Sequence, residues 1–503
     1  MMNRKFIKIV VFLLSLLFLI TGLSACGKNE EDQTIGSVEE LNGRDMGCMS
    51  GSIFDVLIQE QFPDSDIIYF GSRSELLLGL TQGKIDGFVS DEPVAMMMVK
   101  QNDQVTYLDE AVGSVEYGIC FSDDSKEIML EFNEYLSEII TNGHIEELRN
   151  KWINPDGAEQ KKEERQLDGH NGIIRCVTTP DAAPFSFMSN NEFQGYEVEL
   201  LTEFCYEYGY EMEISIVSFD ALLTSVAMNK YDVAFNGIYI TPERAKSVNF
   251  CTPTYEGRDV VMIRNGNSAE KKDLITSIKD SFYKNFIEED RYKLLLSGAL
   301  TTLIIASFSI LFGTLFGLLI FMLSRNSSVF KKVADNVQKL LAKLPAVVLL
   351  MLLFYVVFKS SSISALIVSI IGFAFMFANT FYGLLKTGVA SVDYGQSEAA
   401  MALGYDEIIA FFHIVLPQAL KTICDSYISE VISLIKNTSI VGYVSVNDLT
   451  RSSDIIRGRT YDALFPLIVV AIIYYLLCTA LVALIRIPLK AYIEMKVKYD
   501  DKI

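Results

Sequence analysis

Long apolar runs fill the second half of the chain, whereas short apolar stretches alternate with polar residues in the first half. The runs occupy residues 298–323, 344–358, 363–385 and 463–485. Runs of about 20 apolar residues match a hydrocarbon core of about 30 Å, and the second run is the shortest of the four. The pattern predicts helices that cross a membrane.

In the first half, residues 172–266 alternate between β-type and helix-type patterns. Each expected element has the length and the apolar spacing of a strand or an amphipathic helix. The pattern predicts strands at 173–178, 213–217 and 232–236, and helices at 196–208 and 219–228. This alternation is typical of a doubly wound α/β domain.

The first 26 residues have the pattern of an export signal. Basic residues at positions 4, 5 and 8 precede an apolar stretch at 9–20 and the sequence Leu23-Ser24-Ala25-Cys26. A basic, then an apolar, then a small-residue region is typical of a secretory signal peptide. The last four residues resemble the bacterial lipoprotein box, which implies that Cys26 is lipidated; the alternative is an uncleaved anchor. In either case residue 27 begins outside the membrane.

The distribution of basic residues predicts which helix ends face the cytoplasm. Residues 324–343 contain five Lys or Arg and one acid, and the tail after residue 485 is also basic. Both segments should be cytoplasmic, because basic loops stay inside. One more crossing is then needed, and 427–446 is the candidate although it contains Glu430 and Lys436. We expect five spans; the alternative is that 427–446 lies at the membrane interface.

The two halves also differ in charge. Residues 27–290 contain 50 Asp or Glu and 21 Lys or Arg, whereas residues 291–503 contain 13 and 19, and the whole chain has a net charge of −20. An acidic surface of this size repels phosphates, which excludes a nucleic-acid partner.

The sequence lacks the patterns of metal, redox and ATP-hydrolysing sites. Its eight cysteines form no C-x-x-C pair, and its three histidines are far apart. A metal site is therefore not expected. No G-x-x-x-x-G-K-[ST] motif occurs, so the chain should not hydrolyse ATP by itself.

The most specific motif lies in the segment expected to be cytoplasmic. It contains Glu398, Ala399 and Ala400, then Ala-Leu-Gly ending at Gly404, and Leu-Pro-Gln-Ala at 416–419. Together with Leu-Ile-Lys-Asn-Thr-Ser at 434–439, it resembles the permeases of ABC importers, particularly the polar amino-acid branch. The resemblance covers residues 292–489. It implies that the 395–420 loop docks on a separate cytosolic ATPase, which holds ATP-Mg, and that the permease forms a homodimer; no cofactor is expected in this chain.

Other motifs resemble periplasmic amino-acid-binding proteins. Ala-Pro-Phe at 183–185, Gly-Tyr at 195–196 and Thr-Pro-Glu-Arg at 241–244 resemble the first half of lobe 1 in that family. Leu-Asn-Gly at 41–43 and Asp-Glu-Pro at 91–93 resemble lobe 2. Residues 117–119 and the helix that ends near Trp152 resemble the C-terminal part of lobe 1.

The order of these parts implies a circularly permuted, type II binding-protein clamshell ahead of an all-α permease. Domain termini usually lie close together at the surface, so permutation is tolerated. The alternative is two tandem domains, each missing a half. The expected segments are a signal peptide (1–26), a tether (27–40), lobe 2 (41–112), the C-terminal part of lobe 1 (113–153), a solvated linker (154–171), the N-terminal part of lobe 1 (172–266), a connector (267–291), the permease (292–489) and a cytoplasmic tail (490–503).

The resemblance also implies a site for a free amino acid. Arg244 matches the residue that binds the α-carboxylate, with backbone N–H groups near Gly237 and Tyr239, and Asp91 matches the acceptor of the α-ammonium. A guanidinium suits a carboxylate because it donates two parallel hydrogen bonds. Two further positions complete the expected site, the aromatic wall Phe219 and the helix-terminal Ser52.

These features predict a subunit of an ATP-driven amino-acid importer in a bacterial cell membrane, with its binding domain outside. The alternative is a ligand-gated channel or sensor built on the same clamshell, against which the motif at 395–404 counts. A third hypothesis is an enzyme on the same fold, such as a small-acid dehydratase. The sequence contains no His, Cys or Ser constellation that supports catalysis.

Overall fold

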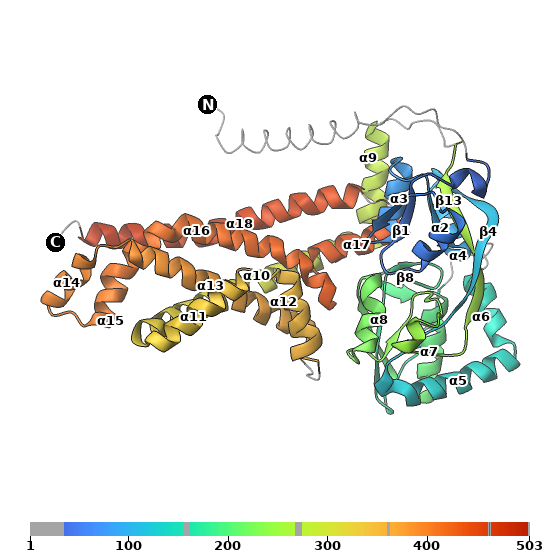
Figure 1. Cartoon of the computed structure of the whole chain (residues 1–503), viewed down its shortest axis with the longest axis horizontal. Coiled ribbons are helices and arrows are strands. Elements are labelled where there is room, and N and C mark those ends of the chain that lie inside the picture. Colours follow the sequence, from blue (N-terminus) through green and yellow to red (C-terminus); the bar gives the residue numbers. More distant parts are fainter. Residues whose placement is uncertain are drawn as a thin grey trace.

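The structure is a computed structural model that describes residues 35–153, 161–266, 274–359, 363–460, 462 and 464–500. A two-lobed α/β domain lies at one end of a bundle of long helices (Figure 1). The expected signal peptide, with Cys26, lies outside the described residues, as do the first part of the linker and the end of the tail.

Lobe 2 is built on a five-stranded sheet with the order β2-β1-β3-β13-β4. β1 pairs in parallel with β2 and β3, and β13 runs antiparallel to β3 and β4. The strands are β1 (Met46–Met49), β2 (Ile67–Phe70), β3 (Gly87–Asp91), β4 (Val105–Tyr117) and β13 (Tyr255–Arg264), and the helices are η2 (Val38–Leu41), α2 (Phe54–Gln61), α3 (Arg73–Thr81) and α4 (Glu92–Gln101).

Lobe 1 is built on a second five-stranded sheet with the order β10-β6-β11-β5-β12, and a small sheet β7-β8-β9 lies beside it. Its strands are β5 (Cys120–Phe121), β6 (Ile173–Thr178), β7 (Asp181–Ala182), β8 (Ser186–Ser189), β9 (Glu192–Gln194), β10 (Glu211–Ile216), β11 (Val233–Ala234) and β12 (Asn249–Phe250). Its helices are η3 (Asp123–Ser125), α5 (Lys126–Thr141), α6 (His144–Trp152), α7 (Tyr196–Tyr208), α8 (Phe219–Ala227) and η4 (Arg244–Lys246). The strands and helices expected between residues 172 and 236 occur at their predicted positions.

The two chain segments form one clamshell. β5, from before the linker, pairs with β11 and β12, from after it, so neither segment completes the lobe 1 sheet without the other. The chain crosses between the lobes twice, from β4 to β5 and from β12 to β13. The expectation that residues 172–266 belong entirely to lobe 1 is wrong for β13, which lies between β3 and β4 in lobe 2. Its apolar run at residues 260–263 is buried there.

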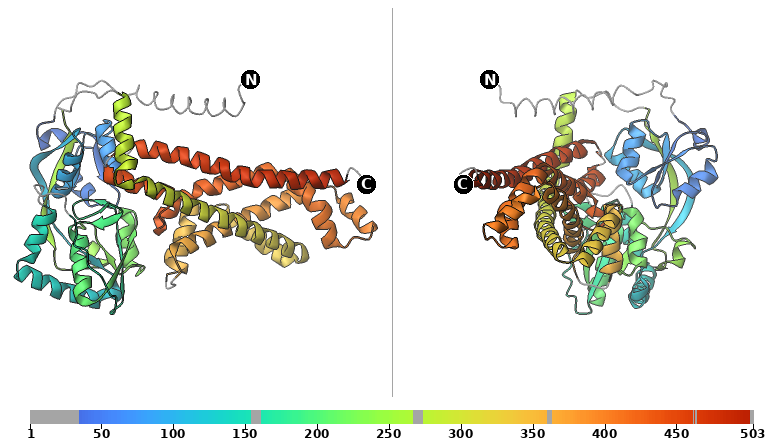
Figure 2. Two further views of the ribbon diagram at one scale, coloured as in Figure 1. Left: turned by 180° about the vertical axis from the view of Figure 1, so that it is seen from behind. Right: turned by 60° about the vertical axis from the view of Figure 1, so that its left-hand side comes forward.

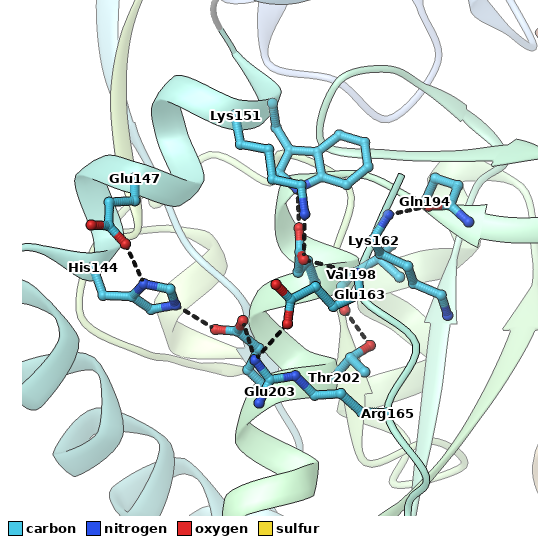
Figure 3. A network of polar contacts seen from close by, with 12 residues as sticks. His144, Glu147, Lys151, Lys162, Glu163, Arg165, Gln194, Val198, Thr202 and Glu203 are labelled. Atoms are coloured by element: carbon cyan, nitrogen blue, oxygen red, sulfur yellow. Dashed lines mark hydrogen bonds and ion pairs between the residues drawn. The ribbon is translucent and has the colours of Figure 1, made fainter. Parts of the chain in front are cut away.

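The described part of the linker lies against α7 (Figure 3), and most of its residues are exposed, as expected for a solvated linker. Arg165 Nη2 donates to the buried Glu203 Oε1 at 2.8 Å. On the other side, His144 Nε2 of α6 is 2.9 Å from Glu203 Oε2. A buried carboxylate is stabilised when it has such partners. Glu203 therefore ties both the linker and α6 to α7.

The second half is helical. The helices form α9 (Leu274–Phe282), η5 (Tyr283–Ile287), η6 (Glu288–Asp290), α10 (Tyr292–Asn326), α11 (Ser328–Leu341), α12 (Ala346–Leu352), η7 (Leu353–Val357), α13 (Ala365–Ala390), α14 (Tyr394–Ala402), α15 (Glu407–Ala410), η8 (Phe411–Val415), α16 (Leu416–Asn437), η9 (Thr438–Val444), α17 (Leu449–Thr460) and α18 (Leu464–Asp500). Both figures place α14 and α15 at the end of the bundle away from the clamshell (Figures 1 and 2). This arrangement agrees with an external clamshell and a cytoplasmic 395–420 loop.

Helix length and hydropathy give four or five spans among the described residues. Four helical stretches are long and apolar enough to cross a membrane: Tyr292–Asn326, Ala365–Ala390, Glu407–Val444 and Leu464–Ile487. The fifth is a pair of helices, Ser328–Leu341 and Ala346–Val357, with a bend of 109° between them, if this pair counts as one span. The chain is therefore a multi-pass membrane protein.

Two of the expected spans differ in extent from the helices of the structure. The run at 344–358 forms only Ala346–Val357, which rises about 18 Å and is too short to cross by itself. The segment 427–446 belongs to a longer helical stretch, Glu407–Val444, whose length of about 57 Å exceeds a bilayer core. Hydropathy alone ranks this segment low because it contains Glu430 and Lys436.

Close packing of α10 on α13 depends on glycine. A Cβ on Gly313 would lie 2.9 Å from the carbonyl oxygen of Ala374, and one on Gly317 would lie 2.7 Å from that of Ala378. Both distances are shorter than a real Cβ contact, so a side chain would push the helices apart. Small residues at such contacts are typical of membrane helix packing.

Candidate functional site in the clamshell

Asp91 lies at the centre of a buried polar cluster between the lobes. It ends β3 of lobe 2, and its Oδ1 accepts hydrogen bonds from the hydroxyls of Tyr117, at 2.9 Å, and Tyr239. Tyr239 comes from lobe 1, so this contact holds the two lobes together. The Tyr239 hydroxyl is also 2.8 Å from Asp259 Oδ1 on the neighbouring strand β13. Asp91, the expected acceptor of a ligand ammonium, is thus hydrogen-bonded to side chains of the clamshell itself.

The arrangement of protons in this cluster follows from burial. Desolvation, with a further contribution from the charge of Asp91, raises the pKa of Asp259 to about 7. A tyrosine hydroxyl has one hydrogen, so Tyr239 donates to only one of the two carboxylates. Near neutral pH a protonated Asp259 can donate to Tyr239, which leaves the tyrosine hydrogen for Asp91. In this arrangement the hydroxyl of Tyr239 has a partner on each side, and Asp91 and Asp259 are not both ionised.

Arg244 also bridges the lobes. It begins η4 of lobe 1, where its Nη1 donates to the carbonyl oxygen of Tyr239 at 3.1 Å. Its Nη2 donates to the carbonyl oxygen of Gly51 in lobe 2 at 3.0 Å. The structure therefore brings Arg244 and Asp91 to opposite ends of the same residue, Tyr239, although they are 153 positions apart in the chain.

Gly237 and Ser52 lie near this cluster but make other contacts than expected. The Gly237 N–H donates to Glu197 Oε2 at 2.8 Å instead of facing the cleft. Gly237 has a φ of 60°, and its missing side chain leaves room for the ring of Phe185. Ser52 precedes α2, as expected, and its hydroxyl accepts from the N–H of Phe54 at 3.4 Å.

Phe219 lies nearer the mouth of the cleft, where an arginine that the sequence did not indicate covers it. The guanidinium of Arg73 is 5.7 Å from the ring centroid. Arg73 comes from lobe 2, and it donates to Asn236 Oδ1 of lobe 1 at 3.2 Å and pairs with Asp181 at 3.7 Å. Local sequence gives no signal for these residues, because Arg73 has the pattern of an ordinary first turn of a helix.

The expected coupling loop forms a short helical hairpin. α14 carries Glu398 and Ala399 on its exposed side and buries Ala400. Gly404 has a φ of 89°, a left-handed conformation that glycine adopts without strain. Apolar side chains stay exposed around it, with Tyr394 at 73% and Leu403 at 79%. An exposed apolar surface of this kind is typical of a protein contact.

The clamshell contacts the helix bundle through both lobes. In lobe 2, Glu75 pairs with Arg457 of α17 at 3.4 Å. In lobe 1, the Tyr231 hydroxyl donates to Ser445 Oγ at 2.6 Å, and Lys230 Nζ donates to the carbonyl oxygen of Phe358 at 3.2 Å. A two-lobed α/β domain that contacts a membrane-spanning helix bundle through both of its lobes is the arrangement of a solute-binding domain joined to a membrane permease.

Comparisons with known families agree with this class. Residues 174–351 match the family of bacterial extracellular solute-binding proteins, family 3. Residues 309–490 match the inner membrane component of binding-protein-dependent transport systems. The chain therefore combines a solute-binding domain and the permease domain of an ABC transporter, and it is a transporter subunit; a channel or sensor is not favoured.

Individual relatives match parts of the chain. The chain is similar to the putative glutamine transport system permease protein GlnP of Rickettsia typhi, with 28% identity over 186 residues that cover 36% of this chain and 85% of that protein. It is 34% identical over 118 residues to the arginine transport system permease protein ArtQ of Bacillus subtilis, covering 24% of this chain and 52% of that one. It is 39% identical over 82 residues to the ABC transporter arginine-binding protein 1 of Escherichia coli, covering 16% and 34%.

Proposed function

We propose that the chain captures a free amino acid between its two lobes and passes it through its own permease domain. The observation that carries the proposal is the convergence of Arg244 and Asp91, one from each lobe, on Tyr239. A cation on one lobe and a carboxylate on the other match the two charges of a zwitterion. The names of the similar permeases and binding protein, which include glutamine and arginine, support an amino acid as the substrate.

The ligand replaces contacts that the clamshell makes with itself. Its carboxylate binds the guanidinium of Arg244 and replaces the hydrogen bond to the carbonyl oxygen of Gly51. Its ammonium binds Asp91 and replaces the hydrogen bond from the hydroxyl of Tyr239. The hinge for this exchange is the pair of strands β4 and β13, which join the lobes and hold each other by antiparallel pairing. The wild-type affinity is thus a balance between ligand contacts and these internal contacts.

The power for transport comes from a separate ATPase that binds the 395–420 loop. The exposed apolar residues around Gly404 support this contact, and they lie at the end of the bundle away from the clamshell (Figure 2). A permease homodimer would present two such loops to a pair of ATPase subunits.

Calorimetric titration tests ligand capture. A fragment of residues 35–266 contains every strand of both sheets, and it should bind one amino acid from a panel of the twenty with one-to-one stoichiometry. Asp91→Ala and Arg244→Ala should each weaken binding by about 10²-fold or more, because either change leaves a ligand charge unpaired. Lys246→Ala, an exposed cation in the same short helix as Arg244, serves as the control and should bind normally. Binding of no amino acid, or normal binding by both variants, would refute the proposal.

A further inference from the structure

A cavity of about 260 Å³ lies where the mouth of the clamshell meets the permease. Both halves of the chain form its wall, which includes Glu75 from lobe 2, Thr179 and Phe219 from lobe 1, and Ser439, Arg451 and Asp454 from the permease. A single water needs only about 10–15 Å³, so the cavity has room for a small molecule or several waters.

The permease side of this cavity presents a partly buried arginine, Arg451, two of whose guanidinium nitrogens have no hydrogen-bond partner among the described residues. These two atoms, Nε and Nη2, are themselves buried. Arg451 lies at the start of α17, and its aliphatic part packs on Gly442. A buried guanidinium is costly unless its donors are satisfied. The geometry therefore calls for an acceptor group inside the cavity.

Carboxylates in the same wall complete a pattern of opposite charges. Asp454 lies three residues beyond Arg451, and therefore on the same face of α17. Asp454 Oδ1 accepts from Arg457 at 3.0 Å, which fixes it in place. Glu75 and Asp181 line the cavity as well. One unsatisfied cation beside several anions again suits a small zwitterion.

The cavity also lies on the route between the two domains. Phe219, expected as a wall of the ligand cleft, lines it on the clamshell side. Ser439, which ends the Leu-Ile-Lys-Asn-Thr-Ser segment, lines it on the permease side, at the top of the long helical stretch Glu407–Val444. The cavity therefore lies between the clamshell and the permease.

We propose that this cavity is a transfer site, in which Arg451 binds the carboxylate of the transported amino acid and Asp454 faces its ammonium after the lobes release it. The inference rests on the proposed function and adds to it a second binding step, made by the permease. Arg451 replaces Arg244 as the carboxylate partner, so the ligand keeps a guanidinium partner while it changes domains.

Thiol protection tests the transfer site in the full-length chain, reconstituted with its ATPase in nanodiscs. Ser439→Cys places a thiol in the cavity wall, and peptide mass spectrometry follows its alkylation by iodoacetamide. An equimolar mixture of the nineteen common amino acids other than cysteine, whose free thiol would consume iodoacetamide, should slow alkylation about tenfold at about ten times the Kd. In the background of Arg451→Met, protection should disappear while calorimetry still detects binding to the clamshell. Arg451→Lys, which keeps the charge but loses the planar fork, should protect partially.

Arg486→Met provides the matched control, because it removes an exposed arginine outside the cavity, and it should leave protection unchanged. The transfer site would be overturned if Arg451→Met kept the protection, or if the chain with the native Arg451 bound amino acids but showed no protection. Either outcome would leave the proposed function intact. A full-length chain that binds no amino acid would overturn both.

Discussion

Glu197→Gln should make the clamshell more stable at neutral and alkaline pH while leaving it almost unchanged at low pH. Glu197 lies in the first turn of α7 and is fully buried. Its Oε2 accepts from the Gly237 N–H at 2.8 Å, and its Oε1 has no partner among the described residues. Desolvation is the main cause that raises its pKa from 4.5 to about 8, and the charge of Asp91 adds to the shift.

The sign of the effect follows from proton binding. Between pH 4.5 and about 8 the folded protein keeps this proton while the unfolded chain has lost it. The free energy of unfolding therefore falls as pH rises through this window, by about 1.4 kcal/mol per pH unit, and the fall ends above the folded pKa. Glutamine resembles the protonated acid in shape and never ionises, so the variant lacks this contribution.

Thermal unfolding of the fragment 35–266 and of its Glu197→Gln variant, from pH 5 to pH 9, measures the difference. The gap between the two midpoints should widen with pH by roughly 3 °C per unit and become constant above pH 8. The window between pH 7 and 8 is the most informative. There Asp259, whose pKa is raised only to about 7, has lost most of its proton, whereas Glu197 still keeps most of its own. Glu60→Gln, on the exposed face of α2, is the control. Two parallel curves would refute the assignment of a protonated Glu197.

Three further predictions concern coupling, topology and the single clamshell. Gly404→Trp, placed at a left-handed φ in the exposed loop, should abolish ligand-stimulated ATP hydrolysis in vesicles without changing ligand affinity; unchanged stimulation would contradict the coupling role. A cysteine at the exposed Lys359 should react with an impermeant thiol reagent from outside, and one at Lys339 only after permeabilisation; the reverse would reject the orientation. Cleavage at a protease site inserted after residue 157 should leave the two pieces associated on gel filtration in native buffer, because β5 pairs with β11 and β12; separation would indicate two independent domains.

The sequence by itself determined the features that depend on neighbouring residues. Apolar runs predicted the membrane helices because insertion depends on the summed hydropathy of contiguous residues. The alternation of β and α patterns located β6, α7 and α8 for the same reason. The motif at Glu398–Gly404 was recognisable because its residues are adjacent in the sequence.

Only the tertiary structure decided which distant residues meet. β13 follows the lobe 1 segment along the chain, yet it pairs with β3 and β4, because strand pairing depends on the free edge that the folded sheet offers. The same holds for Gly237, whose N–H donates to Glu197, and for Arg73, which crosses the cleft to Asn236. The local sequence does not single out Arg451, because its guanidinium is buried only where the clamshell lies against the permease. Burial, which sets the cost of an unpaired charge, is a property of the whole fold and not of the local sequence.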